Sequence, residues 1–189
     1  MRRLFCACLC AVLFSAPVLA AQEKPQGAAP AAAQSAAPEA RPGDVGTIDA
    51  IIGALYDVIS GPATQKRDWG RMRSLFLPGA KLIPTGMHPD GKIGARYLSV
   101  DEYIGRAEPF MEKEGFFESE LARRTEQFGN IAHVWSTYES RRAKGEKPFA
   151  RGINSIQLMN DGHRWWVVNI FWQGESPEQQ LPQKYLEKP

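Results

Sequence analysis

The sequence predicts an α+β fold in which three helices pack on a curved antiparallel sheet. Apolar residues recur at helical spacing in three segments, whereas from Phe116 onward they alternate with a period of two. The turn Asn160-Asp161-Gly162 separates two apolar runs, which is a strong hairpin signal. We therefore expect helices in the first half of the domain and a meander of long strands in the second.

Each expected helix has a start signal. Thr47 can cap the first helix, whose apolar stripe continues until Gly61-Pro62. A shorter second helix begins at Asp68. The third begins at the capping box Ser99-Val100-Asp101-Glu102, in which the Ser hydroxyl and the Glu carboxylate satisfy each other's backbone donors. Pro109 should kink this helix or end its regular part.

Five strands are expected. A short strand at Ala80–Thr85 contains Pro84, which confines it to an edge or to a strand end. Four long strands follow at Phe116–Gln127, Asn130–Arg141, Phe149–Met159 and His163–Gln173. Their connections are short enough for antiparallel neighbours. Because the last strand is apolar on both sides, we expect one sheet face to enclose a cavity with the helices and the other to form a homodimer.

The remaining segments predict an exported protein. Residues 1–20 combine two arginines, an uncharged apolar run too short to cross a bilayer and small residues near Ala20, which is the pattern of a secretory signal peptide. We expect residues 21–43 to form a disordered Ala- and Pro-rich linker, residues 44–174 the domain, and residues 175–189 a C-terminal tail. The expected location is periplasmic or secreted.

Loss of the signal peptide changes both the charge and the cysteine content. The chain has 23 basic and 21 acidic residues, and residues 1–20 hold two arginines and no acid, so the mature chain is neutral. Without clustered positive charge, neither nucleic acid nor a membrane surface is an expected partner. All three cysteines also lie in residues 1–20, which excludes disulfides and thiolate chemistry from the mature chain.

Four segments carry a resemblance to a known family: Trp69–Phe76 with Pro78-Gly79-Ala80, Gly129–Val134, Phe149–Gly152 and Asp161–Trp166. With these segments, the chain resembles the nuclear transport factor 2-like superfamily (NTF2-like), which includes the SnoaL-like and ketosteroid-isomerase-like proteins. The resemblance implies a cone-shaped sheet around a helix-lined pocket, often in a dimer. Enzymes of the superfamily place carboxylates, Tyr or His inside the cone as acids and bases. These residues do not align here position by position, so no activity is carried over.

Glu118 and Glu120 are the first candidates for acid–base catalysis, because side chains two apart on a strand point to the same side. Inside an apolar cone, repulsion and desolvation would raise the pKa of one of them. Alternatively, this face is solvated, or both acids pair with Arg123, Arg124 or Arg151.

His133 and Trp135 share one face of the next strand, and Arg151 lies on the strand after it. On a concave sheet they could bind an oxygenated, partly aromatic ligand, with Arg151 holding a carboxylate and His133 as a further candidate base. The alternative is a hydrogen-bonded His in a dimer interface and an Arg in a structural ion pair. If the faces are reversed, Asn154 is the polar group of the pocket. The other expected wall residues are Tyr56, Trp69, Met72, Phe76, Phe110 and Trp166.

Metal and cofactor sites are not expected. His88 and Asp90 lie in a glycine-rich loop without a third ligand. The sequence contains no phosphate loop, nucleophile elbow, HExxH or paired CxxC motif. Three functions remain open: an exported protein that binds a small apolar or aromatic molecule, an isomerase or lyase with a Glu or His base, and a dimeric interaction module with a filled cone.

Overall fold

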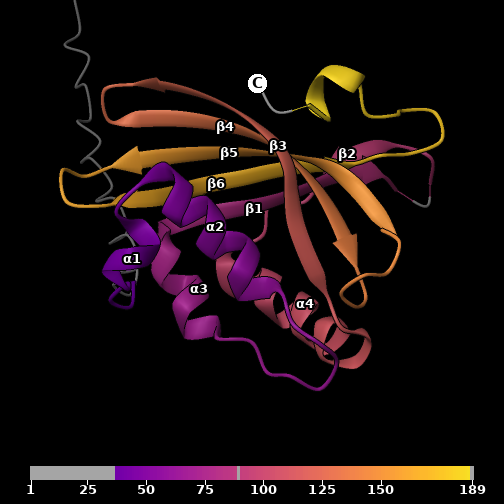
Figure 1. Cartoon of the computed structure of the whole chain (residues 1–189), viewed down its shortest axis with the longest axis horizontal. Coiled ribbons are helices and arrows are strands. Elements are labelled where there is room, and N and C mark those ends of the chain that lie inside the picture. Colours follow the sequence, from indigo (N-terminus) through magenta and orange to yellow (C-terminus); the bar gives the residue numbers. More distant parts are fainter. Residues whose placement is uncertain (1–36, 89, 188–189) are drawn as a thin grey trace, which may run out of the picture. The chain divides into compact units, whose positions relative to one another are not determined.

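The computed structural model describes residues 37–88 and 90–187, which form helices packed on a mixed six-stranded sheet (Figure 1). The strand order is β2-β1-β6-β5-β4-β3. The helices are α1 (Pro42–Val45), α2 (Ile48–Ile59), α3 (Trp69–Leu75), α4 (Val100–Glu114) and the short 3-10 helix η1 (Gln183–Tyr185). The strands are β1 (Phe76–Met87), β2 (Ile93–Ala95), β3 (Phe117–Phe128), β4 (Ile131–Arg141), β5 (Ala150–Asn160) and β6 (Trp165–Gly174).

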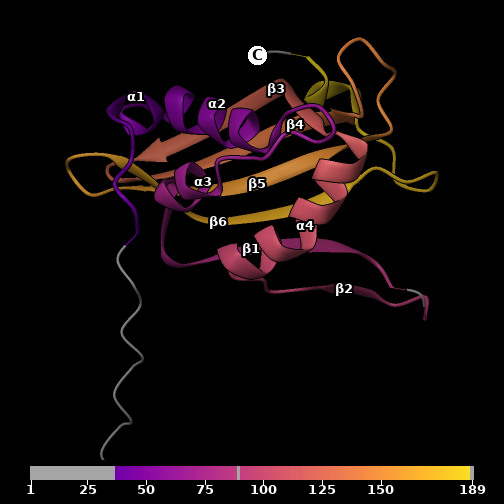
Figure 2. The ribbon, with the colours of Figure 1, turned by 90° about the horizontal axis from the view of Figure 1, so that it is seen from below.

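The three main helices begin where the sequence predicts. The Thr47 hydroxyl accepts a hydrogen bond from the backbone N–H of Ala50 at 3.0 Å, and the Asp68 carboxylate accepts one from the backbone N–H of Arg71 at 2.8 Å. Ser99 and Glu102 form the complete capping box. α4 continues through Pro109 to Glu114, so this proline does not end the helix. Figure 2 shows α2, α3 and α4 on the same face of the sheet.

The four long strands form the expected antiparallel meander. At the β5–β6 hairpin, Gly162 has a φ of 95°, and the Asp161 carboxylate accepts hydrogen bonds from the backbone N–H groups of His163 and Arg164. The sheet is not wholly antiparallel, however, because β1 pairs with β6 in parallel. The physical reason is the long crossover: the chain leaves β1, passes through α4 and β3 to β5, and returns beside β1 in the same direction.

β1 is longer than expected, since α3 ends at Leu75 and the strand starts at Phe76. Pro84 therefore lies inside a strand that is second from the sheet edge. The pairing of β1 with β2 starts only at Thr85, and the Pro84 carbonyl accepts the amide of Arg96 at 3.1 Å. Pro84 thus lies where the pairing of β1 with the edge strand β2 becomes irregular. A residue without a backbone N–H is tolerated at such a position.

The core lies between the helices and the concave face of the sheet. Ile51 and Ile52 of α2, Val134 of β4, Ile156 of β5 and Val167 of β6 are almost completely buried there. Burial of such aliphatic side chains contributes roughly 1.5–3 kcal/mol each. This packing holds α2 against the sheet and so determines the position of the residues that α2 contributes to the cavity.

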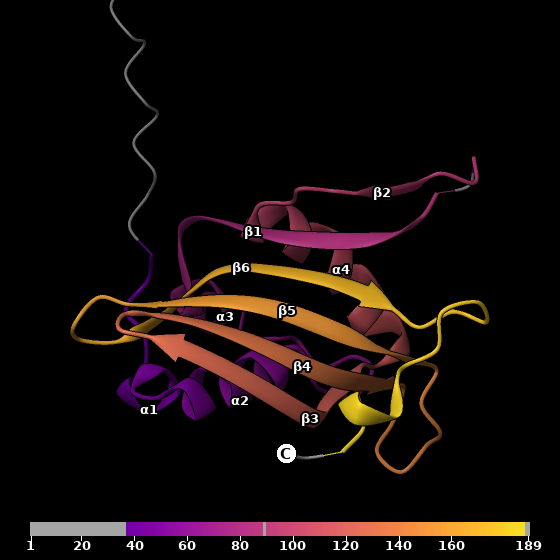
Figure 3. The ribbon, with the colours of Figure 1, turned by 90° about the horizontal axis from the view of Figure 1, so that it is seen from above.

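The C-terminal segment, expected as a tail, folds back on the opposite, outer face of the sheet (Figure 3). Thr137 of β4 donates to the Tyr185 carbonyl at 2.6 Å, and Arg124 of β3 donates to the Lys184 carbonyl at 2.7 Å. The Tyr185 ring lies 5.9 Å from that of Trp135. This segment therefore covers part of the face on which we expected a second subunit.

At the other end, the predicted signal peptide and residues 21–36 of the predicted linker lie outside the described residues. α1 begins at Pro42, two residues before the expected start of the domain. Arg41 pairs with Asp68 at 2.9 Å, which ties the segment before α1 to the start of α3. Among the helices of residues 37–187, none combines the length and the hydrophobicity needed to span a bilayer.

Candidate functional site

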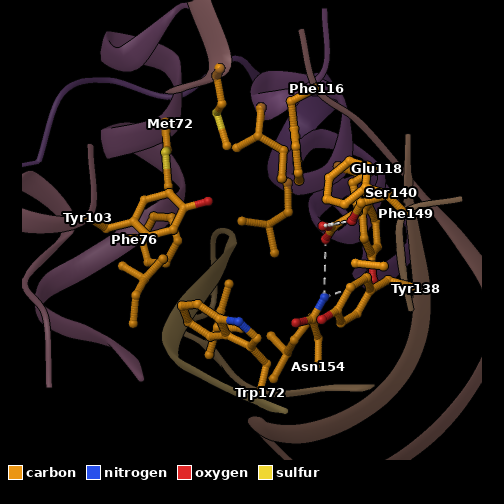
Figure 4. A pocket seen from close by; sticks show the side chains of 18 residues that line it. Met72, Phe76, Tyr103, Phe116, Glu118, Tyr138, Ser140, Phe149, Asn154 and Trp172 are labelled. Carbon is orange, nitrogen blue, oxygen red and sulfur yellow. Dashed lines mark hydrogen bonds between the residues drawn. The ribbon is translucent and has the colours of Figure 1, made fainter. Parts of the chain in front are cut away.

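A cavity of about 270 Å³ lies between the helices and the concave face of the sheet. Its volume is close to the lower end of the range for small-molecule sites, which is about 300–1,000 Å³. Figure 4 shows Met72, Phe76 and Tyr103 on one side, and Glu118 with its neighbours on the other. The wall is mainly apolar and aromatic; it also includes Leu55, Tyr56, Ile59, Leu82, Met111, Phe116, Tyr138, Phe149, Ile156, Ile170 and Trp172.

Glu118 is the acidic residue of this wall. The strand β3 begins at Phe117, and the Glu118 amide donates to the Ser60 hydroxyl at 3.0 Å, which ties this point of the strand to the end of α2. The carboxylate accepts from Ser140 at 2.9 Å and from Asn154 at 3.4 Å. Within the described residues it has no ion-pair partner.

Desolvation raises the pKa of Glu118 to about 7, although the hydrogen bonds from Ser140 and Asn154 act in the opposite direction. The residue as a whole is only partly buried, but its carboxyl faces the apolar cavity. A carboxyl with this pKa is present in both protonation states near neutral pH. It can therefore accept or donate a hydrogen bond, or exchange a proton with a bound molecule.

Two tyrosine hydroxyls at the cavity are available to a ligand. Among the residues described, neither Tyr103 nor Tyr138 has a hydrogen-bond partner for its hydroxyl, and Tyr138 is only 7% exposed. Burial and the nearby Glu118 raise the pKa of both phenols, so they remain protonated donors. Gly152 makes room for Tyr138, because a Cβ on Gly152 would lie 2.6 Å from the Tyr138 hydroxyl oxygen.

Glu120 lies in a different environment from Glu118. Its carboxylate pairs with Arg123 at 2.7 Å and also accepts a short hydrogen bond from Ser136. Because Ser136 donates its only hydroxyl proton to Glu120, it must act as the acceptor toward Tyr56, whose hydroxyl donates to it at 2.7 Å. Tyr56 then accepts from Asn154 at 3.2 Å.

In this chain of hydrogen bonds, Asn154 donates to Tyr56, Tyr56 donates to Ser136, and Ser136 donates to the carboxylate of Glu120. It leaves the Asn154 amide nitrogen as a donor to both Tyr56 and Glu118. The expectation that the two glutamates lie on the same side is therefore confirmed. The alternative pairing with an arginine applies to Glu120 only. The two acids are thus divided into a structural ion pair and a candidate functional group.

Some of the predicted wall residues are in the cavity and others are not. Tyr56, Met72, Phe76 and Asn154 line it together with Glu118. The other three predicted aromatic wall residues, Trp69, Phe110 and Trp166, do not line it. Trp69 donates its indole N–H to Glu108, Trp166 donates its own to Asp161, and Phe110 stacks on Arg142.

The expected placement of His133, Trp135 and Arg151 in the cone is wrong. They lie on the outer face of the sheet, where His133 is within 3.0 Å of the Ser155 hydroxyl and Arg151 pairs with Glu175 at 2.9 Å. The cause is a reversed assignment of the two faces. A strand alternates, and the residues of β4 that face the helices are Ser136, Tyr138 and Ser140.

A second cavity of about 310 Å³ lies on this outer face, between the sheet and the C-terminal segment. Trp135, Ile153 and Phe171 form its floor, and Leu181 and Tyr185 lie on its other side. Among the described residues that line it, Glu175 is the only acidic or basic side chain of the Asp, Glu, Lys, Arg or His type, and it is paired with Arg151. It therefore lacks the isolated ionisable group that distinguishes the cone.

Sequence reasoning missed Tyr103, Tyr138, Ser140 and Trp172 as wall residues. Tyr138 and Ser140 could have been found from Asn154, because the assignment of faces that puts Asn154 inside also puts its neighbours on β4 inside. Tyr103 was visible only as part of the apolar stripe of its helix. For His88 and Asp90, no group of three or more His, Cys, Asp or Glu in the described part of the chain is placed to hold a metal.

No family model matches the sequence, and a comparison with curated proteins gives no match. Solved structures do resemble it. A Nostoc punctiforme protein of unknown function with a cystatin-like fold has a TM-score of 0.53 at 8% identity, over 69% of this chain and 90% of that one. A Xanthomonas campestris protein, assigned provisionally as a calcium/calmodulin-dependent protein kinase II association domain, has 0.50 at 14%, over 69% and 86%.

An NTF2-like protein of unknown function from Silicibacter pomeroyi aligns over 69% of this chain and 94% of its own, with a TM-score of 0.46 at 14% identity. The α+β architecture, with helices on one face of the sheet, matches the fold expected from the sequence, and the likenesses to the Nostoc punctiforme and Xanthomonas campestris structures concern this fold. At such low identities the likeness concerns the fold alone. The function has to be argued from the site.

Proposed function

We propose that this protein binds a small apolar or aromatic molecule in the cone and holds one polar group of that molecule at Glu118. The observation that carries the proposal is the Glu118 carboxyl, which faces an apolar cavity without a cationic partner among the described residues. Buried carboxyls are normally paired, because an isolated charge is costly to bury. A bound group that shares a proton or hydrogen bond with Glu118 would remove this cost.

The rest of the wall supports the same function. Tyr138 offers a hydroxyl donor on the Glu118 side of the cavity and Tyr103 offers one on the opposite side, and the apolar side chains around them suit a hydrocarbon or aromatic body. A cavity with a few polar groups on an apolar wall is the usual form of a small-molecule site. The same cavity argues against a module with a filled cone.

The test is a fluorescence titration with N-phenylnaphthylamine, a neutral aromatic probe. We expect Ile170→Trp, which adds bulk to the cone wall, to abolish binding. The matched control is Ile153→Trp on the outer face, which should leave binding unchanged. The proposal fails if the probe does not bind, or if only the outer-face variant blocks it. If the probe binds in the cone, native mass spectrometry of protein purified from its own host is the next step to identify the natural ligand.

Proton transfer is a second candidate function, favoured by the pKa of Glu118 near 7 and by two tyrosine donors in the wall of the same cavity. Glu118 would remove a proton next to a carbonyl, and a tyrosine hydroxyl would donate to the developing oxyanion. Deuterium exchange into 2-tetralone, followed by NMR, tests this. Exchange should require Glu118 and be lost in Glu118→Gln, while His133→Ala should retain it. Equal rates with and without the protein would exclude this activity for the probe.

Export and self-association belong to the same proposal. The pattern of residues 1–20 supports cleavage after Ala20 and release outside the cytoplasm. Mass spectrometry of protein from the extracytoplasmic fraction should then find an N-terminus at Ala21. For a homodimer through the outer face, the half-exposed Phe171 is the best probe. Phe171→Glu should shift the sedimentation coefficient to that of a monomer, and an unchanged value would exclude this interface.

A further inference from the structure

Arg142 follows β4 directly and holds its guanidinium between two phenyl rings. The guanidinium carbon lies 4.0 Å from the ring centroid of Phe149 and 4.3 Å from that of Phe110. Phe110 belongs to α4, and the two segments are in close contact, since a Cβ on Gly115 would lie 2.6 Å from the Arg142 carbonyl oxygen. Stacking on both sides fixes the plane of the cation and leaves its edge for binding.

No carboxylate compensates this cation within the described residues. Arg71, Arg123 and Arg151 all pair with acidic side chains. The Arg142 guanidinium, by contrast, makes no ion pair or hydrogen bond in the described part of the chain, and its Nη1 is buried without an acceptor. Leaving a buried charged donor unsatisfied is costly, and a guanidinium edge matches the oxygens of carboxylates and similar anions.

Phe149 places Arg142 next to the wall of the cone. Phe149 lines the cavity and packs against Phe116, another wall residue, with 6.2 Å between the ring centroids. Phe149 is 47% exposed, so this part of the wall, its rim, is open to solvent. Ser140, which donates to Glu118, precedes Arg142 by two residues, so the cavity-facing side of β4 leads toward Arg142.

We propose that the molecule bound in the cone carries an anionic oxygen group and that Arg142 binds this group at the rim. This inference rests on the proposed function, because it names the chemical class of the ligand. The body of the molecule lies among the apolar and aromatic side chains, and its charge stays at the solvent side, away from Glu118. The two ends of the site then select two different groups, an anion at Arg142 and a neutral hydrogen-bonding group at Glu118 and the tyrosines.

Two fluorescent probes with the same aromatic scaffold test this inference. N-phenylnaphthylamine is neutral, whereas anilinonaphthalene sulfonate adds one anionic group. We expect the wild-type protein to bind the sulfonate more tightly. Arg142→Met should weaken sulfonate binding by about tenfold or more, as for loss of a charge-assisted hydrogen bond, and leave the neutral probe unchanged. Arg142→Lys should give an intermediate sulfonate affinity, because Lys keeps the charge but not the planar edge.

Lys144→Met is the matched control, because it removes an exposed cation from the same connection and should not change the ratio of the two affinities. If Arg142 only joins the helix to the sheet, both probes will lose affinity equally in Arg142→Met, and the inference is wrong. Should that variant not fold, the wild-type preference for the sulfonate must fall with added salt, and a salt-independent ratio overturns the inference. Binding of the neutral probe alone refutes the role of Arg142 and leaves the proposed function intact, whereas binding of neither refutes both.

Discussion

Replacement of Glu118 by Gln should remove a large part of the pH dependence of stability. Its carboxyl has a pKa of about 7 in the folded protein, against an ordinary value of 4.5 for a solvated glutamate. Because the folded-state pKa is the higher one, the stabilising contribution is fully present below about pH 4.5 and is lost as the pH rises through 7. At about 1.36 kcal/mol for each tenfold change in proton affinity, the loss is roughly 3 kcal/mol.

The assay is urea unfolding of the wild type and Glu118→Gln over this pH range. Gln has almost the shape of the protonated acid and does not titrate, so the stability of the variant relative to the wild type should rise by roughly 3 kcal/mol between about pH 4.5 and 7. Contributions from the histidines are common to both proteins and cancel in the difference. Glu126→Gln, on an exposed part of the same strand, is the matched control for removal of a carboxylate. Parallel curves for the wild type and Glu118→Gln would refute the reasoning about desolvation of this carboxyl.

Three further substitutions test the surroundings of the site. Gly152→Ala places a Cβ 2.4 Å from the Gln173 carbonyl oxygen and 2.6 Å from the Tyr138 hydroxyl, so it should cost about 1–3 kcal/mol in thermal unfolding and weaken probe binding. Glu120→Gln removes the less exposed of the two acidic partners of Arg123, the other being Asp49, and should destabilise by about 1–3 kcal/mol in urea, whereas no loss would mean that this pair is fully solvated. Tyr185→Ala should speed amide exchange in residues 181–187 without changing binding in the cone, and unchanged exchange would show that this ring does not anchor the segment.

The local signals in the sequence were sufficient for most of the fold. Thr47, Asp68 and Ser99 start helices because their side chains accept backbone amides within one turn, and this depends only on neighbouring residues. The four long strands and the Asn160-Asp161-Gly162 turn were likewise local features. The parallel pairing of β1 with β6 joins segments far apart in the chain, and no periodicity encodes it.

The candidate site was only partly predictable for the same reason. Alternation says that His133 and Trp135 share a face, but not which face is concave, and here the concave face belongs to Tyr138 and Ser140. The pairing of Glu120 with Arg123 depends on the bulge in β3 between Glu120 and Ala122, because residues three apart on a regular strand point to opposite sides.

By itself, the sequence determined the order and type of the three main helices and the four long strands, the resemblance to NTF2-like proteins and the presence of two acids at the start of the third strand. These follow from side-chain periodicity, capping and turn chemistry, which act over a few residues. Only the tertiary structure decided which acid is isolated in the cavity, which tyrosines line the same cavity, and that Arg142 stacks on Phe149 of its wall. Each of these depends on the desolvation and partners that distant segments provide, and those arise only when the sheet closes over the helices.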